Sequence, residues 1–138
     1  AGNLTAYGKS VSAEHYGEWV IDSKMKPLSG HQKNIGWLRA IIRGQDVIHS
    51  GTTDCGVPLL VLCSTESRSG RKYSPKVDTA DVILDVRQIQ HWAPTLSSDV
   101  TVSPIPDARH DVYLSQPAVR DAALNRVEQW LASIGYSN

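Results

Sequence analysis

The sequence lacks an excess of charge of either sign. Fourteen Lys and Arg balance fourteen Asp and Glu, so the formal net charge is zero. A surface that follows nucleic-acid phosphates needs a basic excess, and we therefore expect no nucleic-acid partner. Long apolar runs are also missing. The longest covers residues 57–63, far short of the roughly 20 residues that a membrane-spanning helix needs.

Cysteine is scarce, and its spacing carries no metal or redox signal. Cys55 and Cys63 are the two cysteines, without a Cys-x-x-Cys pattern. A disulfide framework is therefore not expected; a reducing, cytoplasmic compartment is favoured instead. The histidines that share no metal-ligand spacing are His15, His31, His49 and His91. The sequence thus predicts neither a metal nor another cofactor.

The length of 138 residues fits one domain. Residues 1–31 are rich in glycine and poorly periodic, and we expect irregular structure there with one short helix. Residues 32–138 alternate between helical and extended patterns. Because the first residue is Ala1 and the last stretch is a well-formed helix pattern, we expect a chain that ends naturally and lacks its front half.

The predicted elements from residue 32 onward alternate between helix and strand. They are a helix over 32–43 ended by Gly44, a strand over 57–63 buried on both faces, a long loop over 68–79, a helix capped by Asp85 and stopped by Pro94, a strand over 100–105, a loop over 106–113, and a helix from Pro117 to Gly135. Such alternation predicts α/β class and a short parallel sheet flanked by helices. Since two strands alone make a poor sheet, the pattern indicates half of a larger sheet.

Two residues occupy the places where parallel sheets carry reactive groups, just past the carboxyl ends of strands. His110 follows the second strand, and Asp81 follows the first strand beyond the long loop. In a right-handed β-α-β unit both loops emerge on the same edge, so the two side chains can meet. A carboxylate that accepts the imidazole Nδ1–H fixes the tautomer and leaves Nε2 free to take a proton.

Other interpretations of these residues stay open. A lone loop histidine is usually exposed and idle, and Glu66 lies nearer the end of the first strand than Asp81 does. The remaining carboxylates have simpler roles. We interpret Asp78 as a loop residue, Asp85 as a helix cap, Asp107 as part of a turn and Asp111 as a surface ion-pair partner.

Three segments together resemble the C-terminal region of α/β-hydrolases. They are residues 57–62, residues 81–85 and residues 106–113, followed by the closing helix. The nearest group is the bacterial lysophospholipase and monoacylglycerol-lipase-like hydrolases. The resemblance implies the C-terminal half of an α/β-hydrolase fold, with His110 as the general base and Asp81 as the acid of a catalytic triad. It makes residues 1–31 a remnant of the lid or cap region.

The sequence departs from that family in two places. The family's acid follows its strand within a few residues, whereas residues 64–67 here hold no Asp. Asp81 as the acid makes residues 68–80 an insertion, with Glu66 in reserve. The nucleophile elbow Gly-x-Ser-x-Gly is absent as well. Its nearest match, around Ser10, lacks the second glycine and follows no strand pattern.

Two functions follow as hypotheses. In the first, the chain is part of a serine hydrolase for small-molecule esters or lipids, inactive without a serine from an N-terminal part of the same protein. In the second, it is a stand-alone, non-enzymatic module that binds a partner or forms a homodimer through exposed sheet edges.

Overall fold

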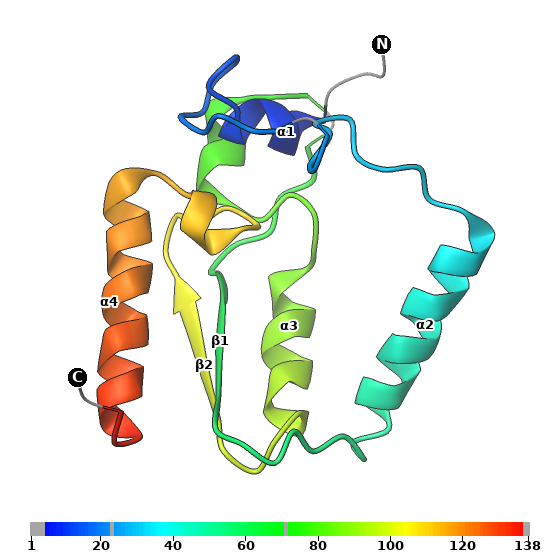
Figure 1. Cartoon of the computed structure of the whole chain (residues 1–138), viewed down its shortest axis with the longest axis vertical. Coiled ribbons are helices and arrows are strands. Elements are labelled where there is room, and N and C mark those ends of the chain that lie inside the picture. The colour runs from blue at the N-terminus through cyan, green and yellow to red at the C-terminus, as the bar shows by residue number, and fades with distance from the viewer. Residues whose placement is uncertain (1–4, 23, 71, 137–138) are drawn as a thin grey trace.

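The computed structural model describes residues 5–22, 24–70 and 72–136. They form a mixed α/β structure in which helices flank a two-stranded parallel sheet (Figure 1). The α-helices are α1 (Ala6–Val11), α2 (Ile35–His49), α3 (Val86–Trp92) and α4 (Pro117–Ser133), the strands are β1 (Leu59–Ser64) and β2 (Val100–Ile105), and the 3-10 helices are η1 (Pro75–Thr79), η2 (Ala93–Thr95) and η3 (Val112–Leu114).

The two strands pair in parallel along their whole length. Leu59 lies opposite Val100 and Ser64 opposite Ile105, and the connection between the strands carries η1, α3 and η2. The predicted α/β order and the strand over 100–105 are confirmed, while the first strand begins two residues later than predicted. Both strands thus end at the same edge of the sheet, where the chain enters the loops that hold Asp81 and His110.

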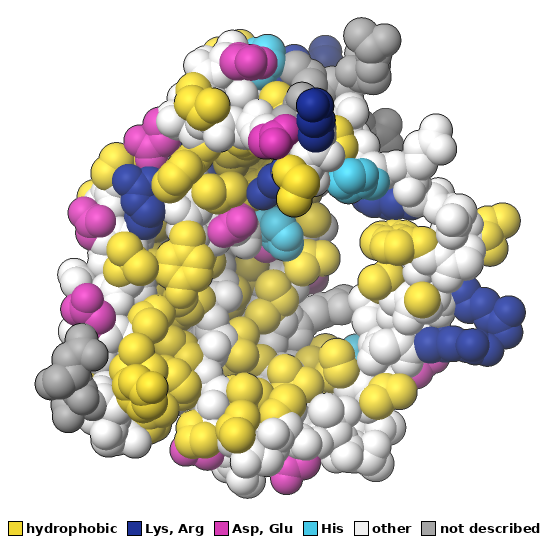
Figure 2. All heavy atoms as spheres, in the orientation of Figure 1, with side chains coloured by type: hydrophobic (Ala, Val, Ile, Leu, Met, Phe, Trp, Pro, Cys, Tyr) yellow, Lys and Arg dark blue, Asp and Glu magenta, His cyan; other side chains and the backbone are white. Residues whose placement is uncertain are grey.

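The sheet is covered less completely than its apolar sequence predicts. Helices α3 and α4 contact the strands, whereas α2 stands apart from them in Figure 1. As a result the residues from Leu59 to Leu62 are only half-buried, and β1 is buried only at Cys63 and Ser64. The prediction of a first strand buried on both faces is therefore wrong for this chain. Figure 2 shows apolar side chains exposed on the face of the molecule that is turned toward the viewer, and an open gap beside α2.

Helix α2 begins later and ends later than predicted. The Asn34 side chain accepts the Trp37 backbone N–H at 2.7 Å and starts the helix. The helix continues through Gly44, because one interior glycine costs only about 0.5–1 kcal/mol, and the chain leaves it at Gly51 with φ of 67°. No residue of α2 is buried. Its apolar stripe is exposed at Leu38, Ile41 and Ile42.

The other helices follow the predicted signals more closely. The Asp85 carboxylate accepts the Arg87 backbone N–H at 3.0 Å and caps α3, and a 3-10 turn that contains Pro94 follows this helix. Helix α4 begins at Pro117, and Gly135 after it has φ of 83°. None of the helices in the described part of the chain has the length and apolar character that crossing a bilayer requires.

A cluster of buried apolar residues lies between α4 and the loop that follows β2. It consists of Ile105, Ala108, Val112 and Ala123, with Leu62 and Val119 packed against it. Ala108 and Ala123 are both fully buried, so α4 approaches the loop closely. This packing supports the turn that carries His110.

Substituting Ala123→Leu tests how tightly α4 holds this turn. Ala123 is 0% exposed, so the added atoms overpack the core, and we expect unfolding to become easier by about 1–3 kcal/mol. The neighbouring Ala122 is exposed, and Ala122→Leu is the matched control, with an expected effect within about 0.5 kcal/mol. Urea denaturation followed by circular dichroism measures both. Equal effects at the two positions would contradict the described packing.

Candidate active site

Two backbone hydrogen bonds bring Asp81 back to the end of β1. The Arg68 N–H donates to the Asp81 carbonyl at 2.8 Å, and the Asp81 N–H donates to the Glu66 carbonyl at 2.9 Å. Residues 69–80 therefore leave the sheet edge and return to it, and Asp81 forms an isolated parallel bridge with Ser67. Although Asp81 lies far along the chain from β1, it is in space a residue of the strand's carboxyl end.

Asp81 and His110 contact each other, as the β-α-β topology predicts. His110 Nδ1 lies 3.0 Å from Asp81 Oδ2. The other carboxylate oxygen, Oδ1, accepts the backbone N–H groups of Ile83 and Leu84, each at 2.8 Å. An ionised carboxylate only accepts hydrogen bonds, so Nδ1 carries the proton that it shares with Asp81. Within the described part of the chain, the His110 ring makes this hydrogen bond through Nδ1, and its Nε2 makes no hydrogen bond.

The two members of the pair differ in exposure and in charge. Asp81 is 2% exposed, whereas a third of the His110 side chain is exposed. Burial raises the pKa of Asp81, but the hydrogen bonds from His110, Leu84 and Ile83 lower it, and the resulting pKa lies below the ordinary value of a carboxyl group. The carboxylate is therefore ionised at neutral pH while the imidazole stays accessible.

Helix α1 contributes a residue that sequence reasoning did not identify. The Tyr7 ring meets the His110 ring edge-on, with 5.8 Å between the ring centroids. Burial and the nearby Asp111 carboxylate both raise the pKa of Tyr7, so its hydroxyl is neutral. No local pattern marks Tyr7, because only the tertiary fold places α1 beside the loop that follows β2.

Glu66, the alternative acid, makes no hydrogen bond to His110 in the described part of the chain. Glu66 pairs with Arg68 at 2.8 Å, and half of its side chain is exposed. Asp111 pairs with Lys26 at 3.8 Å on the surface, and Asp107 lies in a turn with φ of 58°, as interpreted from the sequence. The interpretation of Asp78 as a loop residue is incomplete, because the residue is buried, with 7% of its surface exposed.

Ser10 and Cys63 are both buried, and no described hydrogen bond joins either of them to His110. Ser10, at the nearest match to an elbow, is fully buried, and its hydroxyl bonds to Asp78 and Arg109. Burial raises the pKa of the Cys63 thiol, which keeps it protonated. No serine hydroxyl in the described ranges hydrogen-bonds to His110. The arrangement is that of a partly exposed imidazole oriented by a buried carboxylate.

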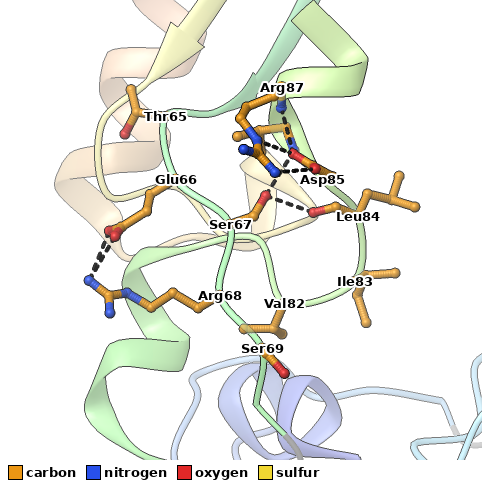
Figure 3. Close-up of a pocket in the computed structure, with 11 residues that line it drawn as sticks. Thr65, Glu66, Ser67, Arg68, Ser69, Val82, Ile83, Leu84, Asp85 and Arg87 are labelled. Atoms are coloured by element: carbon orange, nitrogen blue, oxygen red, sulfur yellow. Dashed lines mark hydrogen bonds and ion pairs between the residues drawn. The ribbon is translucent and has the colours of Figure 1, made fainter.

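A cleft of about 390 Å³ opens beside the histidine. Its lining comes from β1 and from the loop after β2: Leu60, Leu62, His110, Asp111, Val112 and Tyr113. A larger hollow of about 680 Å³ lies beyond the start of α3 (Figure 3). There the Ser67 hydroxyl accepts the Val86 N–H and donates to the Leu84 carbonyl, each at 2.8 Å, and the lining carboxylates pair with Arg68 and Arg87. The smaller cleft is therefore the candidate site.

Metal ligation has no support at this site. No group of three or more His, Cys, Asp or Glu side chains in the described part of the chain is arranged to hold an ion. Of the histidines outside the site, His49 stacks on Trp92 with ring centroids 4.0 Å apart.

Comparisons with protein-family models, with curated proteins and with solved structures find no match to this chain. The functional inference therefore depends on the site's own geometry.

The lowered pKa of Asp81 predicts how stability depends on pH. In the unfolded chain the Asp81 carboxyl has its ordinary pKa of 3.8. As the pH falls, it therefore takes up a proton there before it does so in the folded chain. The stabilisation from Asp81 is thus fully present above that value and is lost as the pH falls through the lowered pKa. We expect wild type to be more stable than Asp81→Asn at pH 7 and the difference to shrink in acid.

Chemical denaturation of both proteins across this pH range measures the difference. Asp121→Asn, at an exposed position of α4, is the matched control and is expected to follow wild type throughout. A gap between wild type and Asp81→Asn that does not change with pH would contradict the stabilising role of the ionised carboxylate.

Proposed function

We propose that this chain supplies the histidine and the acid of a Ser-His-Asp triad in an α/β-hydrolase that cleaves carboxylic esters or lipids. The observation that carries the proposal is the 3.0 Å contact between Asp81 Oδ2 and His110 Nδ1. This contact joins a buried, ionised carboxylate to an accessible imidazole at the carboxyl edge of a parallel sheet. The resemblance of residues 57–62, 81–85 and 106–113 to the C-terminal region of that family supports the same assignment.

In the proposed reaction each residue has one role. His110 Nε2 takes the proton of a serine hydroxyl supplied by another part of the protein, and the serine oxygen attacks the ester carbonyl. The imidazolium then gives its proton to the departing alkoxide, which leaves an acyl-serine. Water, deprotonated by the same nitrogen, attacks the acyl-serine to release the acid and regenerate the serine. Asp81 holds the tautomer and stabilises the imidazolium in both halves.

The surroundings of the pair suit this role. The cleft beside His110 includes the apolar side chains Leu60, Leu62 and Val112, which fit the acyl or alcohol part of an ester. The half-buried strand β1 and the exposed apolar stripe of α2 are surfaces that a further part of the same protein would cover. Strands from that part would complete the sheet and place the nucleophilic serine beside His110 Nε2.

Ester hydrolysis by a longer form of the protein, one that includes a Gly-x-Ser-x-Gly segment upstream, tests the proposal. His110→Ala is expected to abolish turnover of a short-chain nitrophenyl ester. Asp81→Asn is expected to lower kcat by about 10⁴-fold, because the histidine loses the tautomer that the carboxylate fixes. The 138-residue chain by itself is expected to show no turnover.

Glu66→Gln is the matched control, since Glu66 lies near the same strand end but pairs with Arg68. We expect it to retain wild-type kcat. Activity that survives His110→Ala would remove this residue as the base. A large loss with Glu66→Gln and none with Asp81→Asn would move the acid to Glu66.

Self-association is the second candidate function, and the open sheet favours it. The described sheet has only β1 and β2, so each strand leaves one edge without a strand partner. Open edges of this kind pair readily with a second copy of the same chain. The exposed stripe of α2 adds apolar surface that a dimer would bury.

Sedimentation equilibrium of the 138-residue chain tests this candidate. Self-association predicts a dimer that dissociates on dilution, and predicts that Leu60→Lys, at a half-buried position of β1, weakens it, because a lysine on an edge strand opposes pairing. Circular dichroism checks that the variant remains folded. A monomer at every concentration would exclude the homodimer.

A further inference from the structure

A buried ion pair lies next to the Asp81–His110 pair and joins the same two loops. Arg109 Nη2 lies 3.1 Å from Asp78 Oδ1, and the two side chains are 3% and 10% exposed. Arg109 directly precedes His110 in the chain, and Asp78 precedes Asp81 by three positions. Each loop therefore contributes one partner to the buried pair and one partner to the candidate site.

The guanidinium of Arg109 connects the histidine loop to several other segments. Its Nε donates to the Ser10 hydroxyl of α1 at 2.8 Å, and its Nη1 donates to the Leu114 carbonyl at 2.7 Å. The Arg109 backbone N–H donates to the Ser115 hydroxyl at 2.9 Å. These bonds restrict the residue before His110 from three directions, both through its backbone and through its side chain.

The Asp78 carboxylate is held with equal completeness. Its Oδ1 accepts hydrogen bonds from the Ser10 hydroxyl and from Arg109, and its Oδ2 accepts the Tyr73 hydroxyl at 2.8 Å. Burial, and the hydrogen bond to Asp78, raise the pKa of Tyr73 to about 12, so this phenol remains a donor. The cluster of Ser10, Tyr73, Asp78 and Arg109 is thus internally satisfied.

A buried ion pair is a weak source of stability, because desolvation offsets its attraction and apolar residues of similar size often serve as well. What it supplies is a defined geometry, since directional hydrogen bonds between planar groups tolerate little displacement. The Asp81 carboxylate is fixed to its own loop by Ile83 and Leu84. Any slip between the two loops would therefore move Oδ2 directly away from His110 Nδ1.

We propose that Arg109 and Asp78 are positioning residues, whose buried pair sets the register of the two loops so that His110 Nδ1 meets Asp81 Oδ2. This inference rests on the proposed function, because it assigns the pair a task at the same site. Neither residue touches the reacting atoms. Their effect reaches the chemistry only through the tautomer and orientation of His110.

The tautomer of His110 is the readout that distinguishes positioning from mere stabilisation. Nitrogen-15 NMR of the full 138-residue chain, recorded at alkaline pH where imidazole is neutral, shows which ring nitrogen carries the proton. We expect the wild-type His110 proton on Nδ1. We expect Arg109→Lys to give a mixture of tautomers, because lysine keeps the charge but cannot bond in the three directions of the guanidinium.

The decisive variant replaces both partners, as Asp78→Leu with Arg109→Met. Removing one partner alone leaves a buried charge and endangers folding, whereas a double apolar replacement avoids that penalty. We expect this double variant to keep a thermal midpoint near that of wild type. We still expect it to lose the single Nδ1–H tautomer of His110. Asp85→Asn is the matched control. It removes the exposed Asp85–Arg87 pair while keeping a capping side chain, and its His110 tautomer is expected to match wild type.

The possible outcomes separate the two proposals. If Arg109→Lys and the double variant both keep the wild-type tautomer, the positioning role is overturned and the proposed triad is unaffected. If Asp85→Asn disturbs the tautomer as much as they do, the effect is not specific to the buried pair, and the positioning role is overturned again. If wild-type His110 itself lacks the Nδ1–H tautomer, the contact with Asp81 does not form, and the proposed function fails as well.

Discussion

A carboxylate removed from water must find donors, and Asp81 finds three. Two are the backbone N–H groups of Ile83 and Leu84, which belong to its own loop, and the third is His110. The first two fix the carboxylate to its own loop, and the third joins the loop that follows β1 to the loop that follows β2. The buried charge therefore ties together the two loops at this edge of the sheet, and the candidate site depends on it.

The sequence was informative where a short-range rule applied. The parallel β-α-β unit placed the loops after both strands at one edge, and this alone predicted that Asp81 and His110 can meet. Asp85 was recognisable as a cap, and Pro117 as the start of α4, because capping chemistry is local. The sequence already favoured Asp81 over Glu66 through its resemblance to a family, but the backbone bonds that return residue 81 to the strand end have no sequence signature.

Features that depend on contacts between distant segments could not be predicted. The Asp78–Arg109 pair joins positions 31 residues apart and draws in Ser10 from α1, and no periodicity signals a partner of that kind. The apolar run in β1 correctly indicated a strand. It did not reveal how much of that strand is covered, because α2 lies away from the sheet. Helix α2 also passed through Gly44, where a weak local preference gave way to the residues on either side.

The way residues 69–80 leave and rejoin the sheet has a consequence for how this region can vary. The segment is closed at its base by the bonds of Arg68 and Asp81 with their neighbours, and it is anchored again at Asp78. Because loop-closure entropy grows only slowly with length, residues added or removed near Gly70 would lengthen or shorten an arc whose two ends stay in place. The number of residues between β1 and Asp81 can thus change without any change in the distance between Asp81 and His110.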